Sequence, residues 1–167
     1  MRTRKNSSAT IPIDSPERRR LPALLRQSWY GLNQAFRRRI AHLRITPDQF
    51  TVLRILTEGD KKGLTQRELT EKMSSDPNTV ASLLERMESA KLLERTSHED
   101  DRRAHRIHLL AMGQKNYVAA REIAVALQGE ILKALPDKNR NQFLEELELV
   151  AAACREAAEK SPRKRVS

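Results

Sequence analysis

Hydrophobic residues recur every three or four positions along most of the chain, which is the spacing of one helix face. The first such run predicts a long helix over about 21–43. Its apolar face contains Leu25, Trp29, Leu32, Phe36, Ile40 and Leu43. The spacing returns from Gln114 onward and continues to Ala158, with a Leu-Pro-Asp break at 135–137. The pattern therefore predicts one long helix near the N-terminus and two near the C-terminus.

Three shorter helices are predicted between the long ones, and each begins with a capping signal. Two begin with a threonine followed three residues later by Gln or Glu, the capping-box spacing; these pairs are Thr46 with Gln49 and Thr65 with Glu68. The third begins at Asp76 and Pro77, an N-cap and a first helical residue. The predicted helices are 47–58, 66–73 and 77–90, and the last has a buried stripe of Val80, Leu83, Leu84 and Met87. Two capped helices joined by a short turn form a helix-turn-helix.

Residues 92–96 and 106–110 predict a short hairpin directly behind the helix-turn-helix. In the second segment Ile107 and Leu109 alternate with Arg106 and His108, as a strand with one buried face requires. A hairpin in this place is a wing. We therefore predict a mainly α fold with a small β-hairpin wing: a winged helix-turn-helix lobe plus a helical region.

The formal net charge of +10 is unevenly spread. Residues 1–20 carry six Lys/Arg against two acids and residues 160–167 carry four against none, whereas residues 137–159 carry three against six. This distribution predicts a polyanionic partner on one side, and nucleic acid is favoured because no segment has the Trp/Phe-lined basic face of a membrane-surface helix. No apolar run is long enough to cross a membrane, and a single cysteine suits the reducing cytosol, so we expect a cytoplasmic protein.

The helix predicted over 77–90 is the candidate for reading DNA. Its polar residues Asn78, Thr79 and Ser82 lie away from the apolar stripe, where short side chains can reach base edges. Capping and solvation of the helix are the alternative, and the capped helix in front and the basic hairpin behind favour DNA. The full set of predicted DNA-binding residues is Thr65, Gln66, Ser75, Asn78, Thr79, Ser82, Arg86, Arg102 and Arg103.

The stretch 97–110 contains three histidines and three consecutive acids, so it admits a metal site, a catalytic cluster or a DNA-contacting loop. His105 and His108 are three residues apart in or beside a strand and tend to opposite faces, which disfavours a metal site. Nothing supplies a convergent pocket or a nucleophile with its base, so we predict no catalytic residue and no cofactor. A basic loop fits better, with Arg103 in the minor groove and Asp101 holding the loop through a charge-assisted bond.

The run from Ile45 to Gly113 resembles the MarR family of bacterial winged-helix transcription regulators. "LTQRELTEKM", "NTVASLLERME" and "LLER" match the family pattern in order and spacing. The positions that match the family's wing signature are Asp101, Arg103, Ile107 and Leu109.

Two positions depart from the family pattern. Lys91 stands where the family usually ends its recognition helix with glycine, and Leu110 replaces the usual threonine after the wing. A left-handed residue other than glycine costs about 1 kcal/mol, which favours a different helix ending here. Leu110 is expected to alter how the wing meets the next helix.

The resemblance implies a homodimer whose interface is formed by the first helix and the last two, with two lobes bound to a pseudo-palindromic operator in double-stranded DNA. In many relatives a small, often aromatic effector binds between dimer helices and lobe and releases the DNA. Trp29, Tyr30 and His42 are candidates to line such a pocket and fit core or interface positions equally well. Cys154 lies on an apolar stripe, so we expect it to pack there.

We therefore expect a dimeric DNA-binding repressor without enzymatic activity, consisting of one MarR-type domain over about 21–160. Its expected parts are a basic arm (1–20), a dimerisation helix (21–44), the DNA-binding lobe (45–113), two dimerisation helices (114–160) and a basic tail (161–167). Two alternatives stay open: a metal-responsive regulator of the same fold, and a winged-helix protein-interaction module without specific DNA reading.

Overall fold

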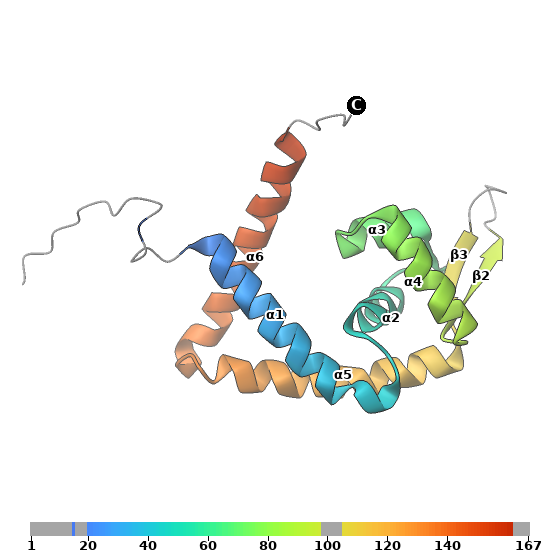
Figure 1. The fold of residues 1–167 in the computed structure, drawn as a ribbon, viewed down its shortest axis with the longest axis horizontal. Helices are drawn as coiled ribbons and strands as arrows, with labels where there is room; N and C mark the ends of the chain where they lie inside the picture. Colours follow the sequence, from blue (N-terminus) through green and yellow to red (C-terminus); the bar gives the residue numbers. More distant parts are fainter. Residues whose placement is uncertain (1–14, 16–19, 98–104, 162–167) are drawn as a thin grey trace, which may run out of the picture. The chain divides into compact units, whose positions relative to one another are not determined.

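The structure is a computed structural model that describes residue 15 and residues 20–97 and 105–161 (Figure 1). The chain divides into two compact units, with the boundary between Ile123 and Ala124. The first unit contains α1 (Leu21–Arg39), the 3-10 turn η1 (Ala41–Leu43), α2 (Pro47–Glu58), β1 (Leu64–Thr65), α3 (Gln66–Met73), α4 (Pro77–Ser89), β2 (Leu93–Ser97), β3 (His105–Leu109) and the start of α5 (Ala111–Leu132). The second contains the rest of α5 and α6 (Asp137–Lys160). Among the described helices, none has the length and apolar character of a membrane span.

The predicted capping boxes are present at the starts of α2 and α3. The Thr46 hydroxyl accepts from the Gln49 N–H at 3.2 Å and the Gln49 side chain accepts from the Thr46 N–H at 2.9 Å. Thr65 and Glu68 exchange the equivalent bonds at 3.3 and 2.7 Å. Each box satisfies two backbone donors that a helix start otherwise leaves without a partner, which fixes where the helix begins.

The sheet has three antiparallel strands in the order β1-β3-β2. The predicted hairpin of β2 and β3 is confirmed, with Arg95 opposite Ile107 and Thr96 opposite Arg106. The additional strand β1 pairs Leu64 with Ile107, which lies 43 residues further along the chain. No local pattern marks this two-residue pairing, so β1 was not among the predicted elements.

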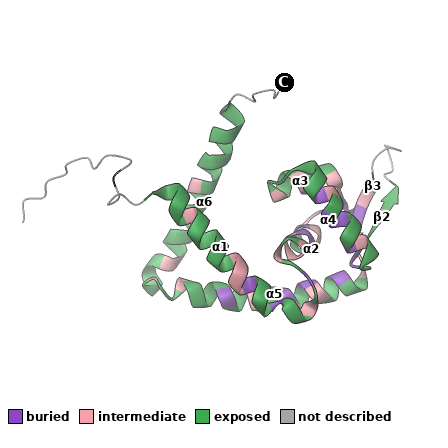
Figure 2. Ribbon diagram, viewed as in Figure 1, coloured by how far each residue is buried: buried purple, intermediate pink, exposed green. Residues whose placement is uncertain are grey.

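The core of the first unit lies where α2, α3, α4 and the sheet pack together, and purple buried residues concentrate in this lobe in Figure 2. The stripe predicted for α4 is buried throughout, and it contributes Val80, Leu83, Leu84 and Met87. The other fully or nearly fully buried side chains of the lobe include Val52, Leu53, Leu69, Leu93 and Ile107. These contacts hold α4 by one face and leave its opposite face exposed.

The first long helix ends earlier than predicted. α1 stops at Arg39, and η1 and a left-handed Arg44 (φ 55°) follow where a continuous helix to 43 was expected. The turn brings Ile40 (fully buried) and Ile45 (6% exposed) into the core, which a straight helix would not do for both. Burial of these two side chains therefore overrides a helical pattern that is locally sound.

α4 ends in a left-handed residue even though that residue is a lysine. Lys91 has φ 58°, so the different ending that its side chain favoured is wrong. The Lys91 N–H donates to the Glu88 carbonyl at 2.9 Å, and the Leu92 N–H donates to the Met87 carbonyl at 3.0 Å. This is the Schellman pattern, and the burial of both Leu92 and Met87 accompanies it. The two hydrogen bonds and the burial of Leu92 offset the conformational cost.

In the second unit an arginine closes the corner between α5 and α6. The Arg140 guanidinium donates to the carbonyls of Leu132 at 2.9 Å and Leu135 at 3.2 Å, and pairs with Asp137 at 2.6 Å. The carbonyls at the end of α5 thereby gain the donors that a helix C-terminus lacks.

Candidate nucleic-acid interface

The exposed face of α4 carries the short polar side chains that were predicted to read DNA. Asn78, Thr79, Ser82 and Arg86 are all exposed and lie opposite the buried stripe. α3 packs against α4 as the first helix of the helix-turn-helix, so the exposed face is held at a fixed orientation. The Nε of Arg86 donates to the Ser82 carbonyl at 3.1 Å, which directs this guanidinium back along its own helix.

Asp76 organises the start of α4. Its carboxylate accepts the backbone N–H groups of Asn78 at 3.0 Å and Thr79 at 2.9 Å. It also accepts a hydrogen bond from the Thr79 hydroxyl. The Thr79 hydroxyl, followed by its backbone N–H, holds the pKa of Asp76 below the ordinary value. The cap itself was predicted, but its bond to the side chain of a predicted base reader was not; an Asp followed three residues later by Thr is the signal that could have indicated it.

Two further predicted DNA-binding residues, Gln66 and Ser75, lie beside the turn between α3 and α4. Gln66 and Ser75 line a cleft of about 490 Å³ whose other walls are Arg67, Thr70, Glu71, Ser74 and Pro77. Both the N–H and the hydroxyl of Thr65 already donate to the Glu68 carboxylate, at 2.7 and 2.8 Å. Gln66 and Ser75 are therefore better placed than Thr65 to reach a phosphate.

The wing is tied to the lobe by two arginines that were not among the predicted site residues. Arg106 on β3 donates to the Gly63 carbonyl at 3.2 Å, and Arg95 on β2 pairs with Glu88 of α4 at 3.6 Å. The signal for Arg106 was the outward position of a long cation on a strand that borders the helix-turn-helix. Arg95 gave no such signal, because it pairs with Ile107 and lies on the same face of the hairpin as that buried residue. The predicted wing residues Asp101, Arg102 and Arg103 lie outside the described residues, as does His98.

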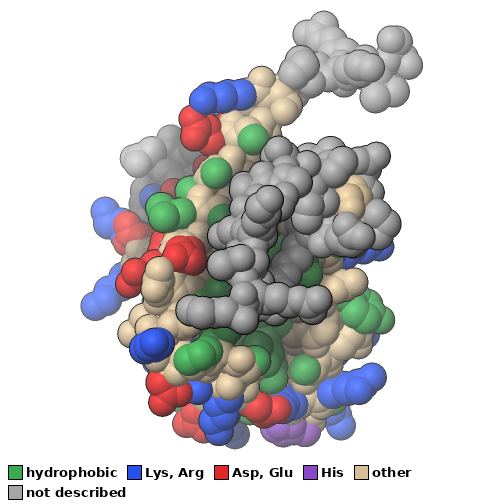
Figure 3. Space-filling view, turned by 90° about the vertical axis from the view of Figure 1, so that its left-hand side faces the viewer, with side chains coloured by type: hydrophobic (Ala, Val, Ile, Leu, Met, Phe, Trp, Pro, Cys, Tyr) green, Lys and Arg blue, Asp and Glu red, His purple; other side chains and the backbone are tan. Residues whose placement is uncertain are grey.

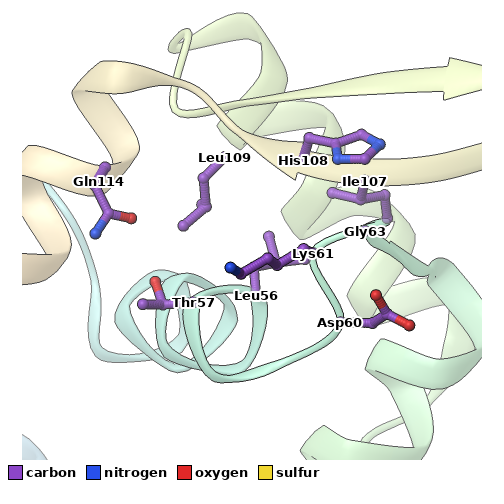
Figure 4. Close-up of a pocket in the computed structure, with 9 residues that line it drawn as sticks. All are labelled: Leu56, Thr57, Asp60, Lys61, Gly63, Ile107, His108, Leu109 and Gln114. Atoms are coloured by element: carbon purple, nitrogen blue, oxygen red, sulfur yellow. The ribbon is translucent and has the colours of Figure 1, made fainter.

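A second cavity, of about 340 Å³, lies at the base of the wing (Figure 4). It is walled by α2, the following loop, β3 and α5, through Leu56, Thr57, Asp60, Lys61, Gly63, Ile107, His108, Leu109 and Gln114. In Figure 4 the Lys61 side chain crosses the middle of this cavity. The His108 imidazole lies 3.1 Å from the Thr96 hydroxyl, so it is part of the hairpin.

The candidate effector residues are on the surface of the protomer. Trp29 and Tyr30 on α1 are 63% and 62% exposed, and His42 in η1 is exposed. None of the three lines either of the cavities described above. Within the described ranges, no group of three His, Cys, Asp or Glu side chains is arranged to hold a metal ion.

The long helices carry large hydrophobic side chains that are exposed in the described part of the chain. They include Leu21, Leu24 and Leu32 of α1, Val118, Val125 and Ile131 of α5, and Phe143, Leu147 and Leu149 of α6. Hydrophobic side chains are visible between charged ones in the space-filling view (Figure 3). Cys154 is exposed, so the expectation that it packs is wrong for the single protomer. Its stripe on α6 has no cover within the described part of this chain.

Comparison with known proteins places this geometry among transcriptional regulators. The model of the MarR family matches residues 45–105. The transcriptional regulator HosA of Escherichia coli O111:H- is 30% identical over 128 residues, which is 74% of this chain and 93% of HosA.

Solved structures share the fold. The MepR–DNA complex of S. aureus is 23% identical with a TM-score of 0.75, covering 81% of this chain and 99% of MepR. The transcriptional repressor CouR bound to a 23-mer DNA duplex is 26% identical with a TM-score of 0.71, covering 78% of this chain and 92% of CouR. CouR from Rhodococcus jostii RHA1 has also been solved bound to p-coumaroyl-CoA, with 24% identity, a TM-score of 0.67 and coverage of 77% and 89%.

Proposed function

We propose that this chain, which belongs to the MarR family of DNA-binding transcriptional regulators, is a homodimeric repressor that binds a pseudo-palindromic operator in double-stranded DNA. The observation that carries the proposal is α4, which is buried along one face and presents the exposed polar residues Asn78, Thr79 and Ser82 along the first two turns of the other. The short side chains on this face allow the helix to approach the base edges closely in the major groove.

The proposed contacts fall into two kinds. Asn78, Thr79 and Ser82 contact base edges, because they occupy the first two turns of the helix that enters the groove. Gln66 and Ser75 contact phosphate from the adjacent cleft. Thr65 and Arg86 are proposed as further DNA contacts outside this cleft. The wing arginines Arg102 and Arg103 add contacts in the minor groove, with Asp101 as their support.

The uncovered hydrophobic faces of α1, α5 and α6 support a homodimer. Side chains such as Trp29 and Leu149, which are 63% and 70% exposed, would be unusual on the surface of a monomer when they occur in such number. A two-fold interface between copies covers the same patch on both partners. We therefore assign 21–44 and 114–160 to dimerisation, 45–113 to DNA binding, and the terminal stretches 1–20 and 161–167 to basic extensions. Cys154 would be covered in that interface.

Release by a small aromatic effector is the proposed control. It is supported by the likeness to CouR, which has been solved both with DNA and with p-coumaroyl-CoA. Trp29, Tyr30 and His42 are proposed as its contacts once a second protomer covers them. An effector acts only through a difference in affinity between the DNA-bound and the free arrangement of the lobes.

We also propose that the protein is cytoplasmic and that it is not an enzyme. A regulator of this family works where the chromosome is, so we place the chain in the cytoplasm. The curated relatives are transcriptional regulators, and we propose that this chain likewise carries out no chemical reaction.

The wing provides the test. Operator duplexes are selected from a random pool, and the affinity of the wild type and of Arg103→Ala is measured by fluorescence anisotropy. Loss of a groove contact by arginine is expected to weaken binding about ten-fold or more, while light scattering still reports a dimer. Arg54→Ala removes the same charge from an exposed position of α2, outside both the predicted DNA-binding residues and the helices assigned to dimerisation. It is the matched control and should change affinity less than about two-fold. Equal effects of the two variants would contradict the wing assignment.

A further inference from the structure

We infer that Thr79 reads the 5-methyl group of a thymine with its own methyl group, and that Asp76 is the positioning residue that sets this preference. The inference rests on the proposed placement of α4 in the major groove and goes beyond it. The residue type alone would suggest a hydrogen bond from the Thr79 hydroxyl to a base. The inference assigns Thr79 an apolar contact instead.

The first step is that the Thr79 hydroxyl proton is already in use. It is donated to the Asp76 carboxylate, and the Thr79 backbone N–H is donated to the same carboxylate at 2.9 Å. The backbone bond holds the Asp76 carboxylate at the helix start, and the hydroxyl bond to that carboxylate then holds the side-chain torsion of Thr79. A charge-assisted bond of this kind is roughly twice as strong as a neutral one, so a base does not readily replace it.

The second step concerns what the fixed side chain leaves for DNA. Thr79 is exposed and its hydroxyl faces its own helix start, so the methyl group is the part available for an outside contact. In the major groove only thymine presents a methyl group, and threonine methyl is among its usual apolar contacts. The hydroxyl oxygen keeps lone pairs, so an amino group of adenine or cytosine is the rival partner that an experiment must separate.

The neighbouring readers differ from Thr79. Within the described part of the chain, the side chains of Asn78 and Ser82 have no hydrogen-bond partner, and both are exposed. Their polar groups are therefore free for base edges. Thr79 is the one of the three predicted base readers whose donor is taken, which is why an apolar role is assigned to it alone.

The test uses uracil, which is thymine without the methyl group. Duplexes selected by the wild-type chain are remade with one thymine of one half-site replaced by uracil, position by position. Loss of one buried methyl contact is expected to weaken binding about four-fold at one thymine. Thr79→Ser removes the protein methyl group, so it should bind the thymine duplex about four-fold more weakly and no longer distinguish uracil.

Two further variants separate the hydroxyl from the methyl group. Thr79→Val keeps a methyl group and has no hydroxyl, and it should still distinguish thymine from uracil. Asp76→Asn keeps a good cap but offers one acceptor oxygen instead of two, which releases the Thr79 hydroxyl and should reduce the discrimination. Thr57→Ser is the matched control, since its hydroxyl donates to the Leu53 carbonyl within α2 at 2.8 Å, and it should leave discrimination unchanged.

Each outcome decides between the ideas. Thr79→Ser that keeps the full uracil effect, or Thr79→Val that loses it while remaining folded by circular dichroism, overturns the inference and leaves DNA binding intact. The same holds if no thymine in the selected site is sensitive to uracil. A wild-type chain that enriches no sequence from the pool instead overturns the proposed operator binding, and the inference falls with it.

Discussion

Replacement of Lys91 by glycine is expected to stabilise the protein. Lys91 is the left-handed residue that ends α4, with φ 58°, and its backbone makes the hydrogen bond to Glu88 whatever its side chain is. In the left-handed region the Cβ atom lies too close to the following carbonyl oxygen, whereas glycine has no Cβ. The perturbation therefore removes a local clash and preserves both hydrogen bonds of the helix end.

The expected gain is a difference between three terms. Relief of the left-handed conformation contributes roughly 1–2 kcal/mol. The greater freedom of glycine in the unfolded chain costs about 0.4–1 kcal/mol. Loss of a lysine at the end of a helix, where its charge interacts favourably with the helix dipole, costs about 0.3 kcal/mol. The net stabilisation is about 0.5 kcal/mol, and for a chain of this size that raises Tm by about 1–2 °C.

Lys91→Ala is the comparison that isolates the conformational term. Alanine loses the same charge and keeps a Cβ, so it should be slightly less stable than the wild type, and glycine should exceed it by about 1 kcal/mol in urea unfolding. Protomer concentration is held constant because the stability of a dimer depends on it. Alanine as stable as glycine would refute the reasoning, since the gain would then come from charge and not from backbone conformation.

Three further predictions concern other parts of the chain. Gly113→Ala would place a Cβ 2.0 Å from the Leu92 carbonyl oxygen, so urea unfolding should show a free energy of unfolding lower by about 3 kcal/mol. Gly129→Ala is the control, because its Cβ would have nothing within 4 Å, and its free energy of unfolding should rise by up to about 1 kcal/mol. Deletion of residues 1–20 should reduce the slope of log Kd against log salt by about 1 for each phosphate that these residues neutralise and leave sequence preference unchanged, as anisotropy titrations at several salt concentrations would show. The lowered pKa of Asp76 implies a contribution to stability that is fully present above the ordinary value of 3.8 and is lost as pH falls through the lower pKa of the folded state. Acid titrations should therefore show that Asp76→Asn loses less stability than the wild type below pH 3.8. Equal losses would contradict this linkage.

Those parts of the fold that depend on neighbours in sequence could be predicted. The starts of α2, α3 and α4 are set by Thr46, Thr65 and Asp76, whose caps reach only two or three residues. The buried stripe of α4 follows from helical periodicity, because α4 packs against the rest of the lobe along only one of its own faces. For the same reason its exposed polar residues could be named before any contact was known.

Those parts that depend on distant residues could not be predicted. β1 exists because Leu64 pairs with Ile107, and two residues carry no periodicity of their own. The end of α1 depends on Ile40 and Ile45 reaching one core, a requirement that appears only after the lobe is assembled. The left-handed Lys91 is a third case, because its intrinsic preference favoured another ending. Its two backbone hydrogen bonds are local, but the burial of Leu92, which helps to outweigh that preference, depends on the assembled lobe.

At the candidate interface, the role of a residue could not be predicted even though the contact that decides it is local. Threonine at position 79 offers a base either a hydroxyl or a methyl group, and composition and spacing do not distinguish the two. The distinction arises because Asp76 caps the helix through a carboxylate with two oxygens, one for the backbone and one for the Thr79 hydroxyl. A serine cap at position 76 would satisfy the backbone through a single oxygen and leave the Thr79 hydroxyl to the DNA. The capping residue and the base reader are therefore one unit, and base preference at this position is expected to depend on residue 76 as much as on residue 79.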